Sequence, residues 1–304
     1  MLGVVGVGRI GEPLVARLTA AGFDVVATDV RPERRDVAER AGARWLPDAA
    51  EVAAAGDVVL TALPGSPELS ELVLRDDGPA DGLLAHMAVG AVWVDLTSAA
   101  FELGSRFSDR AADHGVGFLD APIGGGVSAM REGTATLYVG GRAEVLDGVD
   151  AVLRAFAAEI HHVGGHGTGY LTKLLINLLW FGQATLTTEA LLLAQRHGVS
   201  PGLLSHVLSG SAGDSAFAAK HLPALLAGDY LRDFGLDRCV EELDSVERTA
   251  AAAGVVHPLT AAIAELHRAA LSRFGPVDGE LMGAALLEEW AGTRLSGGGP
   301  STPG

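Results

Sequence analysis

Short apolar runs alternate with helix-forming segments through the first half of the chain. The apolar runs, rich in β-branched and aliphatic residues, cover 2–7, 24–28, 57–63, 91–96 and 116–119. The helix-forming segments, with polar residues spaced for a solvated face, cover 12–21, 33–41 and 100–114. This alternation predicts a parallel sheet with covering helices. Two later runs, 136–139 and 160–163, flank a helical segment at 143–157 and are expected to extend the sheet.

The pattern changes after residue 165. One unusually long helical run covers 169–197, and Gly198 ends it before Ser200 and Pro201 begin the next helix. Further helices are expected at 201–208, 215–226, 237–253 and 258–272, and no strand candidate follows the long run. The sequence predicts a doubly wound α/β domain at 1–165, an all-α domain at 166–294 joined to it by the long helix, and a disordered tail at 295–304.

Length, charge and cysteine content narrow the classes of function. A chain of 304 residues exceeds one usual hydrophobic core, in agreement with two domains. Its formal charge of −16 disfavours binding to nucleic acid or to anionic membrane surfaces. The most apolar segment, 174–194, is interrupted by polar residues such as Asn177 and Glu189, which indicates a buried helix. A single cysteine, Cys239, and a first strand that begins almost at Met1 predict a cytoplasmic protein without a signal peptide.

A glycine-rich turn follows the first predicted strand and opens the first helix. Its residues are Gly6, Val7, Gly8, Arg9, Ile10 and Gly11, a G-x-G-x-x-G pattern in the context where it predicts dinucleotide binding. The first glycine permits the tight turn, the second lets the backbone reach a pyrophosphate, and the third allows close helix packing. The helix N-terminus favours negative charge. The alternative is a glycine-rich turn without a ligand, but the flanking strands and helix favour a Rossmann domain.

An acidic residue ends the second predicted strand. Asp29 lies 18 residues after Gly11, where a carboxylate can accept hydrogen bonds from the adenosine ribose hydroxyls. A 2′-phosphate ~4 Å from that carboxylate would cost roughly 4 kcal/mol per unit charge at an effective dielectric of ~20, which favours NAD. Because Arg31, Arg34 and Arg35 follow closely and could turn toward a phosphate, NADP stays an alternative.

Two further loops are candidate cofactor contacts. Leu63 and Pro64 follow one predicted strand, and Thr97 follows the next. Open α/β sheets bind ligands at the carboxyl ends of their strands. Thr97 could hydrogen-bond to the nicotinamide ribose or carboxamide, or it could serve only as a helix cap.

Two later segments complete a set of four ordered motifs. They are Asp-Ala-Pro-Ile-Gly-Gly-Gly at 120–126 with Gly-Thr-Ala-Thr at 133–136, and Gly-Thr-Gly-Tyr-Leu-Thr-Lys at 167–173 with Asn177. Through these motifs the chain resembles the β-hydroxyacid dehydrogenases, the group that contains 3-hydroxyisobutyrate dehydrogenase, tartronate semialdehyde reductase and, more distantly, 6-phosphogluconate dehydrogenase. The resemblance runs from Met1 to about Arg294. It implies a homodimer or homotetramer and NAD(P)-dependent hydride transfer between nicotinamide and a small β-hydroxy acid or the corresponding carbonyl compound.

The resemblance places the family's catalytic lysine at Lys173 and its partner asparagine at Asn177. At i and i+4, both side chains emerge on one helical face. The lysine would take the hydroxyl proton as hydride leaves, or return it during reduction, while the asparagine orients the lysine or the substrate oxygen. A lysine has an ordinary pKa of about 10.4, so burial or the positive nicotinamide must favour the neutral amine. The alternative is a lysine that snorkels from an apolar helix.

Two departures from the family pattern concern the substrate. Gly124 stands where the family usually has serine, so a hydroxyl that helps to hold the substrate is missing, although backbone amides of Gly125 and Gly126 could bind an oxyanion. The family's later Lys-Asp pair falls on Glu241 and Glu242, which replaces a cation with a carboxylate. We therefore expect a substrate that is larger, less acidic or carries an amine. The alternative is that Glu241 points away and that Gly124 has no effect.

Two other functions stay open. Imine reductases resemble this architecture but commonly lack the lysine, so Lys173 argues against them while Gly124 and Glu241 keep them open. A dinucleotide-binding module that has lost catalysis is opposed by Lys173 and Asn177. The histidines at 161, 162 and 166 have no acidic or cysteine partner at familiar ligand spacing, so no metal site is expected.

Overall fold

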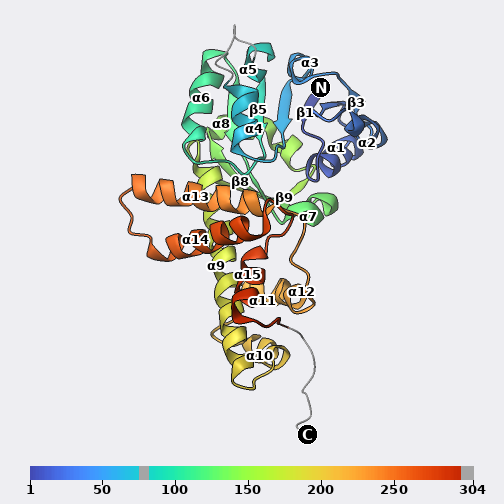
Figure 1. Ribbon diagram of the computed structural model, residues 1–304. Coiled ribbons are helices and arrows are strands. Elements are labelled where there is room, and N and C mark those ends of the chain that lie inside the picture. The colour runs from blue at the N-terminus through green and yellow to red at the C-terminus, as the bar shows by residue number, and fades with distance from the viewer. Residues whose placement is uncertain (75–81, 296–304) are drawn as a thin grey trace. The chain divides into compact units, whose positions relative to one another are not determined.

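The computed structural model describes residues 1–74 and 82–295 (Figure 1). The chain divides into two compact units, residues 1–174 and the residues from 175 onward. All named strands of the described chain belong to the first unit, and the described part of the second unit is helical apart from one isolated bridge between Gly235 and Asp278. The predicted order of an α/β domain followed by an all-α domain is therefore confirmed.

A single sheet organises the first unit. Its strands are β1 (Leu2–Val5), β2 (Val25–Thr28), β3 (Arg44–Trp45), β4 (Val58–Thr61), β5 (Val92–Asp95), β6 (Gly117–Asp120), β7 (Ile123–Gly124), β8 (Ala135–Gly141) and β9 (Ala157–Gly164). The order β3-β2-β1-β4-β5-β6 is parallel throughout and is the order of a dinucleotide-binding Rossmann sheet. The carboxyl ends of these strands therefore meet at one edge.

The predicted parallel pairing is confirmed up to β6, and the strand directions change beyond it. β8 runs antiparallel to both β6 and β7, while β9 runs parallel to β8. β6 and β7 pair with β8 in the same register, although Ala121 and Pro122 separate them. Within this gap the carbonyl of Pro122 accepts the N–H of Tyr138 at 3.3 Å. The predicted runs at 136–139 and 160–163 do extend the sheet, but the chain first reverses direction between β7 and β8, through residues 125–134.

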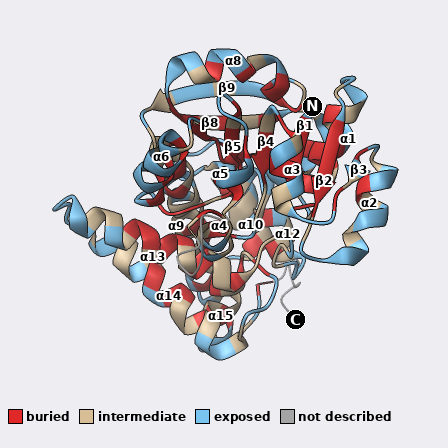
Figure 2. Cartoon of the chain, turned by 90° about the horizontal axis from the view of Figure 1, so that it is seen from above, coloured by how far each residue is buried: buried red, intermediate tan, exposed pale blue. Residues whose placement is uncertain are grey.

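Helices cover both faces of the sheet. In the first unit they are α1 (Gly11–Ala20), η1 (Pro32–Arg34), α2 (Arg35–Arg40), α3 (Ala49–Ala55), α4 (Ser66–Val73), α5 (Leu83–His86), α6 (Leu103–Asp113), α7 (Gly126–Glu132) and α8 (Ala143–Leu153). Successive strand residues point to opposite faces, so Val4 packs in a core with Leu14 of α1 while Val5 packs in another with Phe107 of α6. Figure 2 shows the central strands buried beneath the helices, as in a doubly wound domain.

The later helices confirm the long run and correct one prediction. They are α9 (Thr168–Arg196), α10 (Pro201–Leu208), α11 (Ala216–Lys220), α12 (Leu222–Leu226), α13 (Leu236–Ala252), α14 (Pro258–Phe274) and α15 (Met282–Ala291). The single helix expected at 215–226 is wrong, because Pro223 sits in the first turn of α12 and starts a new helix there. No helix in the described chain combines the length and apolarity that crossing a bilayer would need.

Local contacts mark both ends of the second unit. The division between the units falls after Leu174, within α9, and Asp120 of the first unit accepts N–H groups at the first turn of that helix. The domain boundary expected at residue 165 stays a prediction. At the other end, Leu295 is buried and its N–H donates to Glu288 at 2.7 Å, so the folded part includes this residue. The rest of the predicted tail, 296–304, lies outside the described residues.

Candidate active site

The glycine-rich turn between β1 and α1 fits a dinucleotide. Gly6 has a φ of +95°, and a Cβ there would collide with the carbonyl oxygen of Ala62, while a Cβ on Gly11 would collide with the carbonyl oxygen of Gly6. At Gly8, by contrast, the nearest atom to an added Cβ is Nη2 of Arg31, 3.6 Å away. The protein itself leaves room for a side chain at Gly8, so its own packing does not require glycine there, and the approach of a pyrophosphate to this backbone stays a prediction.

The other residues of the turn differ in exposure. Val7 is buried, Ile10 is half-buried and Arg9 is exposed. The N–H of Val7 donates to Oδ2 of Asp29 at 2.8 Å, which ties the turn to the end of β2. The sheet therefore brings the predicted cofactor residues of the first two strands together.

Asp29 is paired with Arg31, one of three arginines whose contacts the sequence did not predict. Oδ1 of Asp29 accepts the backbone N–H and Nε of Arg31, each at 2.9 Å, and Oδ2 accepts Nη2 of Arg31 at 3.1 Å. Burial raises the pKa of Asp29, but the hydrogen bonds from Arg31 and Val7 and the charge of Arg31 outweigh it and lower the pKa. Asp29 is therefore an ionised carboxylate in a bidentate ion pair.

The loops predicted after β4 and β5 are tied to each other. The hydroxyl of Thr97 is buried, accepts the N–H of Leu63 at 3.1 Å and donates to Oδ1 of Asp95 at 2.8 Å. Both loops follow parallel strands at the carboxyl edge, where Pro64 also lies. The roles of Leu63, Pro64 and Thr97 as cofactor contacts stay predictions.

Asp95 is a buried carboxylate that sequence reasoning did not select. It accepts hydrogen bonds from three hydroxyls, those of Thr61, Thr97 and Tyr170, the last at 2.7 Å. Burial raises the pKa of Asp95 to about 7, against the lowering effect of these donors. The signal in the sequence was a lone Asp at a strand end, two residues before a threonine, which could not by itself reveal a partner 75 residues away on α9.

Asp120 is a second buried carboxylate and holds the start of α9. Its Oδ1 accepts the N–H of Gly167 at 2.8 Å, and its Oδ2 accepts those of Gly169 and Tyr170 at 2.8 and 3.2 Å. Burial raises the pKa of Asp120 to about 6, although the backbone donors act in the opposite direction. A carboxylate at this position satisfies N–H groups that a helix start otherwise leaves without partners.

The seating of α9 determines where Lys173 emerges. Gly169 packs so closely on the carbonyl oxygens of Asp120 and Tyr138 that a side chain of any size would collide with them. Lys173, half-buried, follows Gly169 by four residues and therefore emerges on the same helical face. That face contacts the end of β6 and the middle of β8. The side chain of Lys173 therefore leaves α9 one turn beyond the carboxyl end of β6.

Asn177, one further turn along α9, contacts a carboxylate of α13. Its Nδ2 donates to Oε2 of Glu242 at 2.7 Å, and Glu242 is buried. Glu241, the residue predicted from the sequence, instead accepts a hydrogen bond from Nη1 of Arg238 at 2.9 Å on its own helix. The adjacent pair of glutamates signalled a carboxylate here, but only the packing of α13 shows that Glu242 meets the predicted catalytic asparagine.

Gly124 lies under an aromatic ring. A Cβ on Gly124 would lie 2.9 Å from the phenolic oxygen of Tyr138, so Tyr138 occupies the space that a serine at 124 would need. Gly125 and Gly126 adopt φ of +89° and +64° at the start of α7. These glycines turn the chain after β7 in a backbone conformation that L side chains rarely adopt.

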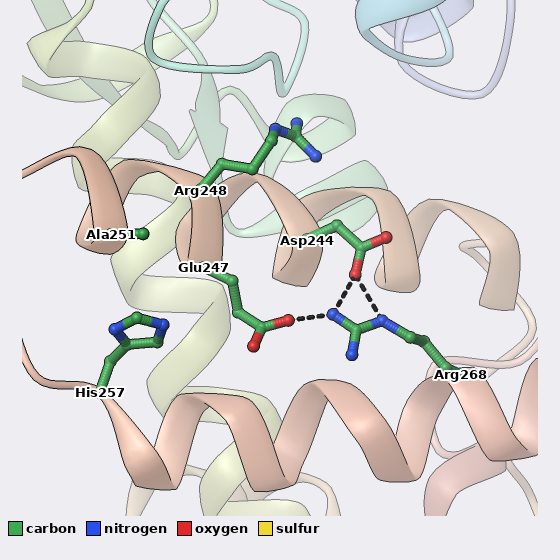
Figure 3. Close-up of a pocket in the computed structure, with 6 residues that line it drawn as sticks. All are labelled: Asp244, Glu247, Arg248, Ala251, His257 and Arg268. Carbon is green, nitrogen blue, oxygen red and sulfur yellow. Dashed lines mark hydrogen bonds and ion pairs between the residues drawn. The ribbon is translucent and has the colours of Figure 1, made fainter.

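A polar pocket between α13 and α14 holds none of the predicted site residues (Figure 3). It measures about 360 Å³, and Arg268 bridges the carboxylates of Asp244 and Glu247 across it. Arg268 of α14 therefore joins the two helices through its ion pairs with both acidic residues of α13. Within the described residues, no group of three or more His, Cys, Asp or Glu side chains is placed to hold a metal ion.

Comparisons with known proteins agree with this arrangement. Residues 1–164 match the family model of the NAD binding domain of 6-phosphogluconate dehydrogenase, and residues 167–283 match that of the NAD-binding region of NADP-dependent 3-hydroxyisobutyrate dehydrogenase. The 2-(hydroxymethyl)glutarate dehydrogenase of Eubacterium barkeri is 29% identical over 98% of each chain. The L-threonate dehydrogenase of Cupriavidus necator is 32% identical over 86% of this chain and 87% of its own.

A solved structure carries the same fold. The Mycobacterium tuberculosis 3-hydroxyisobutyrate dehydrogenase with L-serine aligns with a TM-score of 0.83 and 26% identity, over 94% of this chain and 98% of that one. A Rossmann sheet with a dinucleotide turn, followed by an all-α domain, defines a nicotinamide-dependent oxidoreductase. The chain belongs to the β-hydroxyacid dehydrogenase family, whose named relatives are dehydrogenases of hydroxy acids. Its cofactor is NAD or NADP, and the non-catalytic module considered from the sequence is not retained.

Proposed function

We propose that this dehydrogenase transfers hydride between nicotinamide and the hydroxyl-bearing carbon of a β-hydroxy acid, or the corresponding carbonyl compound, with Lys173 as general acid and base. The bound dinucleotide accepts or supplies the hydride. The Lys173 amine takes the hydroxyl proton in oxidation and returns it in reduction. The observation that carries the proposal is the position of α9 on the sheet. Gly169 packs against the carboxyl end of β6, and Lys173 lies on the same face of α9 one turn later.

The choice of lysine at this position supports the proposal. Only two of the 22 basic Lys and Arg residues are lysines, Lys173 and Lys220. An arginine stays protonated under all ordinary conditions and cannot exchange a proton with substrate, whereas lysine changes its pKa readily when buried. One of these two lysines therefore stands where proton transfer is proposed.

Asn177 is the proposed partner of Lys173, and Glu242 determines how its amide is turned. Oε2 of Glu242 accepts the hydrogen bond from Nδ2 of Asn177, so the NH₂ group of Asn177 faces Glu242. The amide oxygen then points elsewhere and is available to accept a hydrogen bond from an ammonium group or a substrate hydroxyl. Glu242 thus acts as a positioning residue that presents the oxygen of Asn177.

For the substrate we propose a β-hydroxy acid that carries an amine or is only weakly acidic. A buried carboxylate at Glu242 attracts a cation and repels a second acid group. Gly124 has no side chain and so supplies no hydroxyl for a carboxylate, and Tyr138 lies over this position. The related structure that holds L-serine is a precedent for an amine-bearing hydroxy acid in this fold.

The experiment that tests the catalytic role replaces Lys173 with alanine. The Lys173→Ala variant should lose roughly 10²- to 10⁴-fold in turnover, the usual contribution of a positioned acid or base, while its affinity for the nucleotide is retained. Lys220→Ala removes the other lysine of the chain and serves as the matched control. Turnover by Lys173→Ala equal to that of the parent would show that another group handles the proton.

Substrate panels separate the remaining possibilities. Absorbance of NADH and NADPH is followed with 3-hydroxy acids, serine-like amino acids, hydroxy diacids, aldehydes and cyclic imines. A preference for amine-bearing acids supports the proposal, and turnover of cyclic imines alone would favour imine reduction. The Glu241→Lys variant should improve turnover of simple 3-hydroxy acids if Glu241 limits the substrate. No improvement across the panel would leave Glu242 as the discriminating carboxylate.

We also propose that two copies pair through one face of α9. Leu179, Leu186 and Leu193 repeat every seven residues and are 64%, 68% and 62% exposed. Large apolar side chains at heptad spacing are typical of helices that pack on one another. Light scattering should give twice the chain mass or a multiple of it, and Leu186→Glu should shift the protein to monomer. The cytoplasmic location stays a prediction.

A further inference from the structure

We propose that Arg31 is the residue that admits the 2′-phosphate of NADP, and that its ion pair with Asp29 cancels the preference for NAD that Asp29 alone predicts. The inference concerns only nucleotide binding by the first unit. It therefore stands or falls independently of the acid and base role of Lys173.

The Asp29 carboxylate has no position left for ribose hydroxyls. A carboxylate offers about four lone-pair positions. Four donors already point at Asp29: the N–H of Val7 at 2.8 Å, and the N–H, Nε and Nη2 of Arg31 at 2.9, 2.9 and 3.1 Å. Since two of the four come from the guanidinium, ribose hydroxyls can bind Asp29 only after that group has moved.

Arg31 is also the arginine that can move. Its side chain is 53% exposed, whereas that of Asp29 is 5% exposed. Arg34 is held by the carbonyl of Val7 at 2.6 Å and by Glu12 at 3.0 Å, and Arg35 pairs with Glu39 at 2.8 Å. The Nη2 atom of Arg31 lies beside Gly8, so the guanidinium borders the turn that receives the pyrophosphate.

The two nucleotides meet this pair in different ways. NAD displaces the guanidinium from Asp29 and offers it only neutral hydroxyls in return. NADP offers a phosphate, which accepts the guanidinium in a bidentate, charge-assisted arrangement. The phosphate also meets a neutral pair instead of a lone carboxylate, so the repulsion expected from Asp29 alone is largely removed.

The test uses probes of the adenosine end that do not depend on activity. Calorimetry with the full chain measures the dissociation constants of 5′-ADP and 2′,5′-ADP, followed by those of NAD⁺ and NADP⁺. The parent should bind both members of each pair within about tenfold. In Arg31→Ala, affinity for 2′,5′-ADP should fall tenfold or more while affinity for 5′-ADP holds or improves, because Asp29 is released to the ribose.

Arg35→Ala is the matched control, because it removes the same charge four residues along the chain from an exposed pair with Glu39. Its ratio of the two dissociation constants should stay within twofold of the parent. A purely structural role of Arg31 would weaken both probes equally. An unchanged ratio in Arg31→Ala, or a parent that prefers 5′-ADP more than a hundredfold, would overturn the proposal.

Salt supplies an independent readout. Raising the ionic strength from low to physiological values should weaken 2′,5′-ADP binding more in the parent than in Arg31→Ala, because the contact between phosphate and guanidinium is partly exposed and screened. Equal salt dependence in the two proteins would contradict a direct contact with Arg31. These binding ratios do not depend on whether the Lys173 variants lose turnover.

Discussion

The phenol of Tyr170 donates a hydrogen bond to the buried carboxylate of Asp95 across 2.7 Å. Tyr170 lies in the first turn of α9, three residues before Lys173, and Asp95 ends β5. The same carboxylate accepts the hydroxyl of Thr97, which in turn accepts the N–H of Leu63. One carboxylate therefore connects the helix that carries the proposed catalytic lysine to two loops predicted to contact the cofactor.

Replacing Tyr170 with phenylalanine should weaken this connection. The variant removes the phenol donor from a buried oxygen of Asp95, so the free energy of unfolding should fall by about 1–3 kcal/mol. Because the first turn of α9 loses one of its two attachments to the sheet, kcat should fall roughly tenfold or more while KM for substrate changes less. Urea denaturation and steady-state kinetics measure the two effects.

The control for this prediction is Tyr230→Phe. The Tyr230 phenol donates to the buried carboxylate of Glu288 at 2.6 Å in the second unit, so the chemical change is the same. Its stability should fall by a similar amount with kcat unchanged. An equal loss of kcat in both variants would mean that Tyr170 acts only through general stability.

The buried Asp95 predicts a pH dependence of stability. Burial raises its pKa in the folded protein from 3.8 to about 7, so the native state binds a proton that the unfolded chain releases. This contribution is fully present below pH 3.8 and is lost as pH rises through about 7. It amounts to a few kcal/mol at most, since one pKa unit is worth about 1.4 kcal/mol.

The Asp95→Asn variant isolates this contribution. Its unfolding free energy should decline less between pH 4 and pH 7 than that of the parent, as measured by urea denaturation at several pH values. Part of the decline should persist, because burial also raises the pKa of Asp120, to about 6. Parallel pH profiles for parent and variant would show that Asp95 stays ionised throughout.

The glycines of the dinucleotide turn should respond differently to alanine. Gly8→Ala should fold with nearly unchanged stability, because the nearest atom to the new Cβ is 3.6 Å away, yet its nucleotide affinity should fall tenfold or more. Gly11→Ala should instead lose stability, because its Cβ collides with the carbonyl of Gly6. Thermal unfolding and nucleotide titration distinguish the two; a Gly8→Ala variant with full affinity would contradict the backbone approach of the pyrophosphate.

Restoring the family's serine at position 124 should require space. Gly124→Ser places a Cβ 2.9 Å from the phenolic oxygen of Tyr138, so the ring must shift and stability should fall by about 1–3 kcal/mol. Adding Tyr138→Ala opens the space, so the serine should cost less in that background. A double-mutant cycle measures the coupling, and additive effects would mean that the ring does not restrict the serine.

The sequence by itself determined the parts that rest on local rules. The G-x-G-x-x-G turn constrains the backbone of adjacent residues. The apolar run at 169–197 is too long for a strand, so the sequence predicted one helix there. Lys173 and Asn177 share a helical face by spacing alone. Elements of a few residues, such as β3 and β7, were not predicted because they contain too few positions to show a period.

The tertiary structure decided which side chains meet. Tyr170 and Asp95 are 75 residues apart, Gly169 and Asp120 are 49 apart, and Asn177 and Glu242 are 65 apart. No local pattern encodes such pairs, because they depend on how helices pack on the sheet and on each other. The hydrogen bond between Arg31 and Asp29 spans only two residues, yet the sequence also left it open. The side chain of Arg31 is flexible and has several possible acceptors, and only the folded structure shows which acceptors neighbouring groups such as Arg34 already occupy.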